Sequence, residues 1–283
     1  MKKYALYNSS ACNNRGKELA AQLQEIYPED EIIFQNVLEI EDYPAFIQSV
    51  EADAAIVVCG GDGTLNQFIN RTKGAREGKE IYYFACGSGN DFMRDVGKDG
   101  EKVVRIDNYL QNLPKVHIGG QEYEFVNGVG YGIDGYCCEV GDKLRAEKPG
   151  KDISYSGIAI KGLLFHYKPT TATVTVDGKE YTFKNVWLAP TMYGRYYGGG
   201  MMPCPEQSRD SAEQKVSVML FYGSSKLKTL MIFPSLFKGE HVKHQKHVTV
   251  LSGKEITVKY DTPKAAQVDG ETILNVSEYT VKI

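Results

Sequence analysis

The sequence predicts a two-domain protein: an N-terminal α/β domain built on a parallel sheet, followed by a C-terminal β-sandwich. Over the first ~110 residues, apolar strand patterns alternate with helical patterns, which is typical of a parallel sheet covered by helices. From about Pro114 onward, short alternating runs and Gly-containing turns predominate, which favours an all-β domain. We therefore expect domains at residues 1–113 and 114–283, with the option that the C-terminal residues return to the first domain.

The elements of the first domain are expected where apolar runs are bounded by polar or glycine-rich turns. The expected strands lie at 4–7, 31–34, 54–58 and 81–84, and the expected helices at 16–26 and 65–72. In the second domain we expect hairpins at 116–126 and at 171–183, the latter around Asp177-Gly178, and strands at 216–221, 248–251, 256–260 and 279–283. One helix, at about 153–165, interrupts this β pattern.

The bulk composition excludes several classes of partner. The chain has 283 residues, 42% of them hydrophobic and 24% charged, with a formal net charge of -3. No block of clustered Lys and Arg indicates a nucleic-acid partner. No stretch approaches the roughly 18 apolar residues of a membrane helix, and the N-terminus is too short and polar for a secretory signal. We expect a cytoplasmic protein that meets lipid only from the water side.

The first chemically informative motif is Gly60-Gly61-Asp62-Gly63-Thr64, which follows a buried strand and precedes a helix. Consecutive glycines let the backbone approach a ligand, and a helix N-terminus behind them offers N–H groups to phosphate. The Thr64 hydroxyl adds a donor, whereas Asp62 would repel bare phosphate and therefore indicates a magnesium ion or water network. The alternative is a plain strand-to-helix turn with Asp62 as a helix cap.

Two further glycine motifs follow. The segment from Cys86 to Phe92 (CGSGNDF) again runs from a strand through glycines into a helix, so both turns are expected to face one crevice at the strand ends. The segment from Gly130 to Gly135 (GYGIDG) formally matches the dinucleotide fingerprint G-x-G-x-x-G. It lies beyond the α/β half and has no acidic strand end about 20 residues later, so a dinucleotide site is disfavoured.

Taken in order, these motifs resemble the diacylglycerol kinase catalytic family, which includes sphingosine kinases. Further matching segments extend the resemblance over nearly the whole chain, and they are 127–134, 198–201, 238–242 and 267–271. The resemblance implies an N-terminal nucleotide-binding domain, a C-terminal β-sandwich, and an active site in a cleft between them. It implies an ATP-dependent kinase acting on a lipid alcohol such as diacylglycerol, with Mg²⁺ as cofactor.

The same resemblance assigns roles to residues of this chain. Asp269 would be the general base that accepts the proton of the lipid hydroxyl, with Glu271 nearby and Asp62 in the magnesium–water network. Asp91 would reach the metal through water. The residues implied in ATP binding are Asn8, Gly60, Gly61, Asp62, Gly63, Thr64, Gly87, Ser88, Gly89, Asn90 and Asp91. From the residues alone, Asp269-Gly270 is equally well read as a β-turn.

The chain departs from the family pattern in two places. Where the family has Asn-Pro after its first strand, this sequence has Asn8-Ser9-Ser10. Where bacterial members often carry Asp-Asp-Gly linked to a structural magnesium, it has Arg209-Asp210-Ser211. Asp210 would be the remaining carboxylate of that metal site, and the departure weakens the assignment of diacylglycerol itself as the substrate.

Other features have more ordinary interpretations. His241, His244 and His247 recur every three residues, but in a β-rich half we expect surface or loop histidines rather than a metal cluster. The apolar run at 163–167 is expected to be the buried stripe of a helix rather than a lipid-entry surface.

The expected partners are ATP and a membrane lipid, with transient contact at the inner face of the membrane. Strands of a β-sandwich can pair between subunits, so a homodimer is kept as an alternative to a monomer. Two alternatives remain for the function: a catalytically silent nucleotide- or lipid-binding protein, and an NAD kinase, which shares the Gly-Gly-Asp-Gly-Thr turn.

Overall fold

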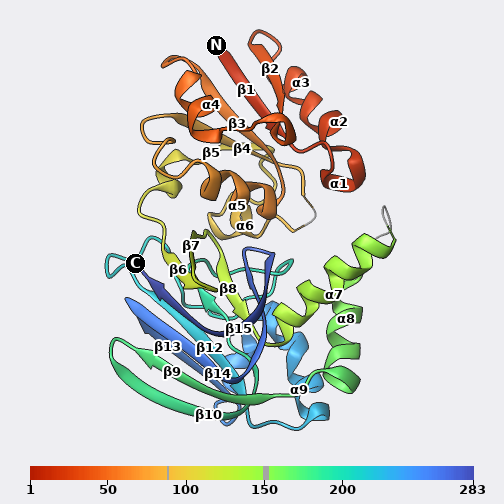
Figure 1. Ribbon diagram of the computed structural model, residues 1–283, viewed down its shortest axis with the longest axis vertical. Helices are drawn as coiled ribbons and strands as arrows, with labels where there is room; N and C mark the ends of the chain where they lie inside the picture. Colours follow the sequence, from red (N-terminus) through yellow and green to blue (C-terminus); the bar gives the residue numbers. More distant parts are fainter. Residues whose placement is uncertain (88, 149–152) are drawn as a thin grey trace. The chain divides into compact units, whose positions relative to one another are not determined.

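The computed structural model describes residues 1–87, 89–148 and 153–283 (Figure 1). It divides into two compact units, Met1–Asn112 and Leu113–Ile283. The first is an α/β unit and the second is dominated by β-structure, so the expected fold class is confirmed.

The first unit is built on one five-stranded sheet with the order β2-β1-β3-β4-β5. Its strands are β1 (Lys2–Tyr7), β2 (Glu31–Asn36), β3 (Ala55–Gly60), β4 (Glu80–Ala85) and β5 (Val103–Arg105). The first four run parallel, whereas β5 pairs antiparallel with β4 at the edge. The strand order reverses at β1 and β3, and ligands of open α/β sheets bind outside the carboxyl ends of strands at such a point.

Short helices connect these strands. They are α1 (Ala11–Asn14), α2 (Gly16–Ala21), α3 (Leu23–Ile26), α4 (Tyr43–Ser49), α5 (Asp62–Arg71) and α6 (Asp91–Asp95). The single helix expected at 16–26 is divided at Gln22, whose N–H donates to the Leu19 carbonyl three residues back (3.1 Å). Helix α5 begins earlier than expected because the Leu65 N–H closes its first turn on the Gly61 carbonyl (3.1 Å).

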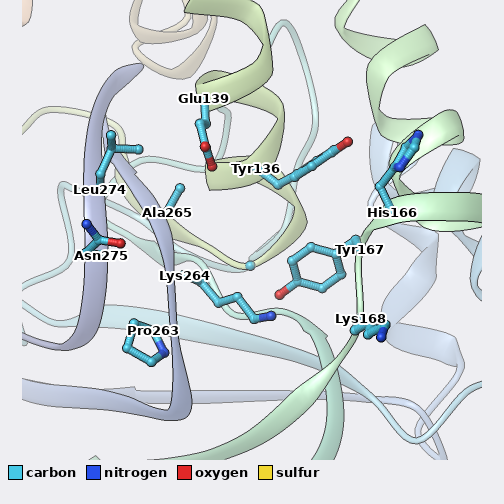
Figure 2. Close-up of a pocket in the computed structure, with 11 residues that line it drawn as sticks. Tyr136, Glu139, His166, Tyr167, Lys168, Pro263, Lys264, Ala265, Leu274 and Asn275 are labelled. Atoms are coloured by element: carbon cyan, nitrogen blue, oxygen red, sulfur yellow. The ribbon is translucent and has the colours of Figure 1, made fainter. Parts of the chain in front are cut away.

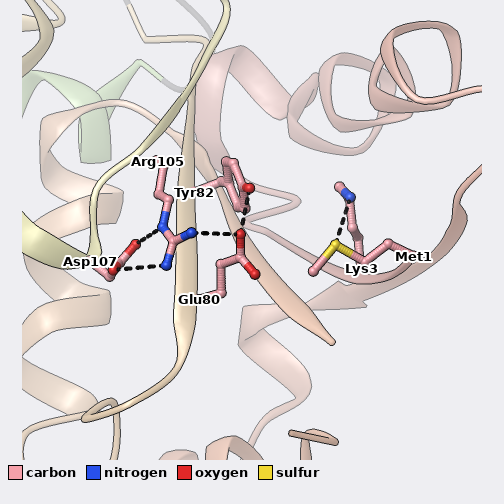
Figure 3. A network of polar contacts seen from close by, with 6 residues as sticks. All are labelled: Met1, Lys3, Glu80, Tyr82, Arg105 and Asp107. Atoms are coloured by element: carbon pink, nitrogen blue, oxygen red, sulfur yellow. Dashed lines mark hydrogen bonds and ion pairs between the residues drawn. The ribbon is translucent and has the colours of Figure 1, made fainter. Parts of the chain in front are cut away.

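A polar network fastens the antiparallel edge of this sheet (Figure 3). Arg105 on β5 donates to Asp107 through Nε (2.6 Å) and to Glu80 on β4 (3.1 Å). The Tyr82 hydroxyl also donates to Glu80 (2.7 Å), and burial together with that carboxylate raises the pKa of Tyr82 to about 12. Because Arg105 is half exposed, each ion pair is expected to contribute only about 0–1 kcal/mol to the stability of the fold. The network therefore serves mainly to align β5 with β4.

The second unit contains ten strands within its described residues, hydrogen-bonded into one continuous sheet. They are β6 (Lys115–Ile118), β7 (Gln121–Glu124), β8 (Gly128–Tyr131), β9 (Thr170–Val176), β10 (Lys179–Leu188), β11 (Thr191–Met192), β12 (Val216–Tyr222), β13 (Val248–Gly253), β14 (Glu255–Val268) and β15 (Glu271–Lys282). Strand β14 pairs with both β8 and β9, so the sheet wraps round and closes on itself. The C-terminal strand β15 pairs with β14 and β6, and the chain therefore ends within the second unit.

The closed sheet encloses a core of aliphatic and tyrosine side chains. Tyr131 stacks on Tyr260 with ring centroids 3.9 Å apart and meets Tyr279 edge-on at 5.6 Å. The Tyr131 hydroxyl donates to the Val276 carbonyl, and the Tyr279 hydroxyl donates to the Ala189 carbonyl (3.0 Å). Each fully buried large side chain contributes about 1.5–3 kcal/mol, and the satisfied hydroxyls avoid the cost of burying polar groups.

Strands β14 and β15 are much longer than the runs expected at 256–260 and 279–283. The register of their pairing shifts between Lys259 and Lys264 and again before Ala266. Such irregularities disturb the two-residue alternation by which a strand is recognised in a sequence. The long hairpin they form ends at the Asp269-Gly270 turn.

The longest helix of the described chain, α7 (Ile133–Glu147), was not predicted. It contains Gly135 and Gly141, which lower helix propensity but are required by close contacts. A Cβ on Gly135 would lie 2.0 Å from the Ala265 carbonyl oxygen, and one on Gly141 would lie 2.8 Å from the Tyr155 ring. The expected helix at 153–165 forms as α8 (Tyr155–Lys161) and a π-helical turn at Gly162–His166, and α9 (Lys226–Ile232) is a further helix.

Candidate functional site

In the first unit, the expected ligand-binding residues gather at the carboxyl ends of β1, β3 and β4. The parallel register aligns Tyr7 with Cys59 and Gly60 with Ala85, so the three strands end at the same edge. Asn8 follows β1, Gly60 to Thr64 follow β3, and Gly87 to Asp91 follow β4. Of the residues assigned to nucleotide binding, Ser88 lies outside the described residues.

The two glycine turns are packed backbone against backbone. The Cys86 N–H donates to the Gly60 carbonyl (2.9 Å). A Cβ on Gly87 would lie 2.4 Å from the Gly61 Cα, and a Cβ on Gly61 would lie 3.2 Å from the Gly87 Cα. Neither position tolerates a side chain without movement, so glycine is required here for the approach of two turns as well as for any ligand.

Asp62 joins the two turns. Its carboxylate accepts the N–H of Asp91 at Oδ2 (2.9 Å) and the N–H of Phe92 at Oδ1 (3.1 Å). It therefore caps helix α6, whose own preceding residue Asn90 has a left-handed conformation with φ of 48°. A carboxylate satisfies orphan N–H donors and favourably meets the helix dipole. The capping role considered from sequence is thus real, but it serves the neighbouring helix rather than α5.

The described residues hold no three His, Cys, Asp or Glu side chains placed to bind a metal ion. Asp91 is buried. Asp210 is exposed in a turn, and its backbone N–H donates to Ser208 Oγ (3.3 Å). His241 is fully buried in a 3₁₀ turn, and its Nε2 lies 2.8 Å from the Pro203 carbonyl oxygen, so the expectation of a surface or loop position was wrong for this histidine.

In the second unit, Asp269 occupies a two-residue Asp-Gly turn with φ of 45° and 96° at Asp269 and Gly270. Its carboxylate accepts three backbone N–H groups from one segment: Val126 (2.7 Å), Asn127 (2.9 Å) and Gly128 (2.9 Å). The Asp269 N–H in turn donates to the Gly128 carbonyl (3.0 Å). The general-base and the β-turn interpretations of Asp269 are both compatible with this geometry, because the turn directs the carboxylate into the protein. Glu271 follows the turn and is exposed.

Arg209 lies next to the same segment and was not assigned a role from sequence. It donates through Nη2 to the Val126 carbonyl (3.1 Å), and its guanidinium lies 5.3 Å from the centre of the Tyr193 ring. Val126 thus connects Asp269, through its N–H, with Arg209, through its carbonyl. A carboxylate and a guanidinium that bind the backbone of the same residue lie close together, so one can act as a proton acceptor and the other as an anion binder.

Asp134, in the first turn of α7, is a second buried carboxylate of this unit. Burial raises its pKa to about 6, although the Gly135 amide and the side chains of Gln267 and Tyr197 oppose the shift. A Cβ on Gly130 would lie 1.7 Å from Asp134 Oδ2. The GYGIDG motif therefore forms a tight connection from β8 to α7 around the Asp134 carboxylate. Strand β8 itself belongs to the antiparallel part of the sheet.

A pocket of about 300 Å³ opens beside α7 (Figure 2). Tyr136 and Glu139 line it from α7, Tyr167 and Lys168 from the segment before β9, and Lys264 from β14. Lys264 Nζ lies 5.2 Å from the centre of the Tyr167 ring. Burial and the charge of Lys168 lower the pKa of Lys264, and an anionic group in this pocket would oppose that shift.

Comparison with known proteins places this geometry in a family. Residues 2–118 match the model of the diacylglycerol kinase catalytic domain, and residues 127–281 match that of the YegS C-terminal NAD kinase beta sandwich-like domain. The second match alone spans more than half of the chain. The chain therefore belongs to the lipid kinase family that these two domains define, and the resemblance seen in its sequence is confirmed.

Individual relatives are distant. The chain is 25% identical over 241 residues to a Bacillus subtilis (strain 168) protein named "Putative lipid kinase YtlR", covering 76% of this chain and 73% of that protein. It is 27% identical over 198 residues to a Mycobacterium tuberculosis (strain CDC 1551 / Oshkosh) "Diacylglycerol kinase", covering 67% of this chain and 62% of that one. A solved structure titled "Crystal structure of a putative diacylglycerol kinase from Bacillus anthracis str. Sterne" matches with a TM-score of 0.67 and 18% identity, over 99% of this chain and 91% of that one.

The contact between the glycine turns predicts an order of damage among three alanine variants. Gly87→Ala should accelerate amide exchange in β3 and β4 most, Gly61→Ala less, because overpacking against backbone costs about 1–3 kcal/mol. Gly74→Ala measures backbone strain without overpacking, since Gly74 has φ of 76° and open space around it. Mass-spectrometric hydrogen exchange measures the effect, and equal protection in all three variants would contradict the packing argument.

Burial of Asp134 predicts a pH-dependent penalty. Its pKa is raised in the folded chain, so stability should fall as pH rises from about 4 to 6 and stay reduced above that range. Asp134→Asn should therefore be more stable than the parent at pH 7, by up to about 3 kcal/mol, and similar to it at pH 4. Urea unfolding followed by fluorescence of the buried Trp187, which lies in the same unit, measures this difference. Asp53→Asn at an exposed site is the control, and a pH-independent difference would contradict the prediction.

Proposed function

We propose that the protein is an ATP-dependent lipid kinase, which transfers the γ-phosphoryl group of ATP to the hydroxyl of a lipid alcohol such as diacylglycerol. The observation that carries this proposal is the pair of glycine turns clamped by Asp62 at the strand ends of a domain matching the diacylglycerol kinase catalytic model. The names of the relatives support the same class of activity. The protein would act in the cytoplasm, at the inner face of the membrane that contains its substrate.

The first unit would bind ATP through backbone as much as through side chains. The N–H groups at the start of α5 and the Thr64 hydroxyl are suitable phosphate donors. Asn90 Oδ1 is buried and has no hydrogen-bond donor among the described residues, so it offers an acceptor to the nucleotide. Bound magnesium would neutralise phosphate charge. Both oxygens of Asp62 already accept N–H groups, so Asp62, like Asp91, would hold the ion through water.

In the second unit, Asp269 would act as general base. The three N–H donors fix the orientation of its carboxylate. As the acceptor oxygen bonds to the γ-phosphorus, its proton passes to Asp269, the bond from that phosphorus to the β-phosphate oxygen breaks, and ADP leaves. Phosphoryl transfer depends mainly on positioning and charge stabilisation. The guanidinium of Arg209, held by Val126 and Tyr193, would supply positive charge to the transferred group.

Asp269→Asn tests this assignment against a structural role, because the chain contains a second turn of the same design. Asp177 also precedes a glycine, donates its N–H to the Glu255 carbonyl, and accepts the N–H groups of Lys254 and Glu255 (both 2.9 Å). We expect Asp269→Asn to lower the rate of lipid phosphorylation by about 10²–10⁴. Asp177→Asn should lose stability without a comparable loss of rate.

The assay uses labelled ATP, magnesium and a total lipid extract, with chromatography of the products and Trp187 fluorescence as a measure of folding. Equal losses of rate in both variants would remove Asp269 from catalysis. ATP binding without any labelled lipid from the parent protein would instead favour a silent binding protein. Labelled NADP⁺ formed from NAD⁺ would favour an NAD kinase.

Arg209→Gln should lower kcat by about 10²-fold while leaving KM for the lipid nearly unchanged, since the guanidinium would act mainly on the transferring phosphoryl group. Arg209→Lys should recover part of the rate. Arg145→Gln is the control, because Arg145 also lies over a tyrosine ring, that of Tyr155 (5.7 Å), but belongs to α7. A loss of rate matched by loss of folded protein would assign Arg209 to the fold instead.

A further inference from the structure

Besides Tyr155, whose ring contacts Arg145, five large apolar side chains are exposed on two neighbouring segments of the second unit, 153–168 and 223–239. We call this set the apolar face, and its members, with their exposed fractions, are Ile160 (48%), Phe165 (73%), Leu227 (70%), Met231 (74%) and Phe237 (46%). Single exposed apolar residues are ordinary, but five on adjoining helical turns form a patch that indicates an interaction site.

These side chains are not core residues that happen to lie near the surface. The same segments send Ile158, Leu163, Ile232 and Leu236 into one shared hydrophobic core, where each is buried. The π-helical turn and α9 contact each other, and Lys226 Nζ donates to the Leu164 carbonyl (2.8 Å). Helices α8 and α9 lie on the same side of this unit (Figure 1). Each segment therefore has one face satisfied by the core and one apolar face without a described partner.

The apolar run at 163–167 is divided between these two roles. Leu163 and Tyr167 are buried, as expected for the stripe of a helix, whereas Phe165 points away from that core. Position 165 is two residues, or about half a helical turn, from both 163 and 167, so its side chain lies on the opposite side of the turn.

The charge of the two segments has one sign. They contain five exposed lysines, Lys161, Lys168, Lys226, Lys228 and Lys238, and no Asp or Glu. The whole chain has a net charge of -3, so this is a local reversal. Apolar side chains interspersed with lysines match the two layers of an anionic bilayer surface: acyl chains below and phosphate headgroups above.

We propose that the apolar face docks the protein on an anionic phospholipid bilayer, with Phe165, Leu227 and Met231 inserted among the acyl chains and the lysines at the headgroups. A second copy of the chain is a poorer occupant, because a two-fold interface through this face would set lysines against lysines. This docking role rests on the proposed lipid kinase function, because it would bring the protein to its lipid substrate. Binding to the bilayer is nevertheless measured without catalysis.

The test is co-sedimentation with vesicles in the absence of ATP, comparing pure phosphatidylcholine with a mixture containing phosphatidylglycerol. The parent protein should sediment with the anionic vesicles, and added salt should weaken this binding. The triple variant Phe165→Ser, Leu227→Ser, Met231→Ser should reduce the partition coefficient at least ~10-fold. Lys226→Gln with Lys228→Gln should reduce it less and remove much of the salt dependence.

Matched controls are Leu38→Ser, at an exposed leucine (58%) of the first unit, and Lys254→Gln with Lys259→Gln on or beside β14. Both should bind vesicles like the parent. The triple variant should still phosphorylate a short-chain, water-soluble acceptor at the parent rate, which separates docking from catalysis. Unchanged vesicle binding by the triple variant would overturn the proposal, as would a dimer in solution that the same substitutions dissociate. Failure of the parent to phosphorylate any lipid would overturn the proposed function while leaving the vesicle result to stand by itself.

Discussion

The second unit depends on one carboxylate that is buried and that accepts three backbone N–H groups. Asp269 accepts the N–H groups of Val126, Asn127 and Gly128, more than 140 positions earlier in the chain. This contact fastens the tip of the β14–β15 hairpin to the segment that leads into β8. Leaving those donors unpaired in a buried site would cost about 1–3 kcal/mol for each group. The same constraint gives the carboxylate one orientation, which is what a proton acceptor in phosphoryl transfer requires.

Asp62 performs the equivalent task in the first unit. Three parallel strands end at one edge, and the glycines of the turns after β3 and β4 have no side chains with which to hold each other there. The Asp62 carboxylate bridges the gap by capping α6. A residue whose sequence context indicates a magnesium–water network is thus observed as a structural clamp. The described helices include none that is long and apolar enough to span a membrane.

Much of this was predictable from the sequence. The parallel strands of the first unit were evident because buried parallel strands are continuous apolar runs, and the glycine turns were evident because close backbone approach admits no other residue. The family followed from the order of these motifs. Helix α7 was missed although Ile133, Cys137, Val140 and Leu144 have helical spacing, since its two glycines and its overlap with a dinucleotide-like motif favoured a turn.

What the sequence alone determined was the class of fold, the position of the glycine turns and the set of polar residues near them, because these follow from local periodicity and from sterics at single residues. Only the tertiary structure decided what those residues touch. Four features depend on contacts between distant segments: the pairing of Asp62 with α6, the binding of Asp269 and Arg209 to the Val126 backbone, the burial of Asp134, and the exposed side of α8 and α9. Hydrogen bonds and burial at such distances are set by how the sheet closes and where helices pack, and no local pattern in one sequence records them.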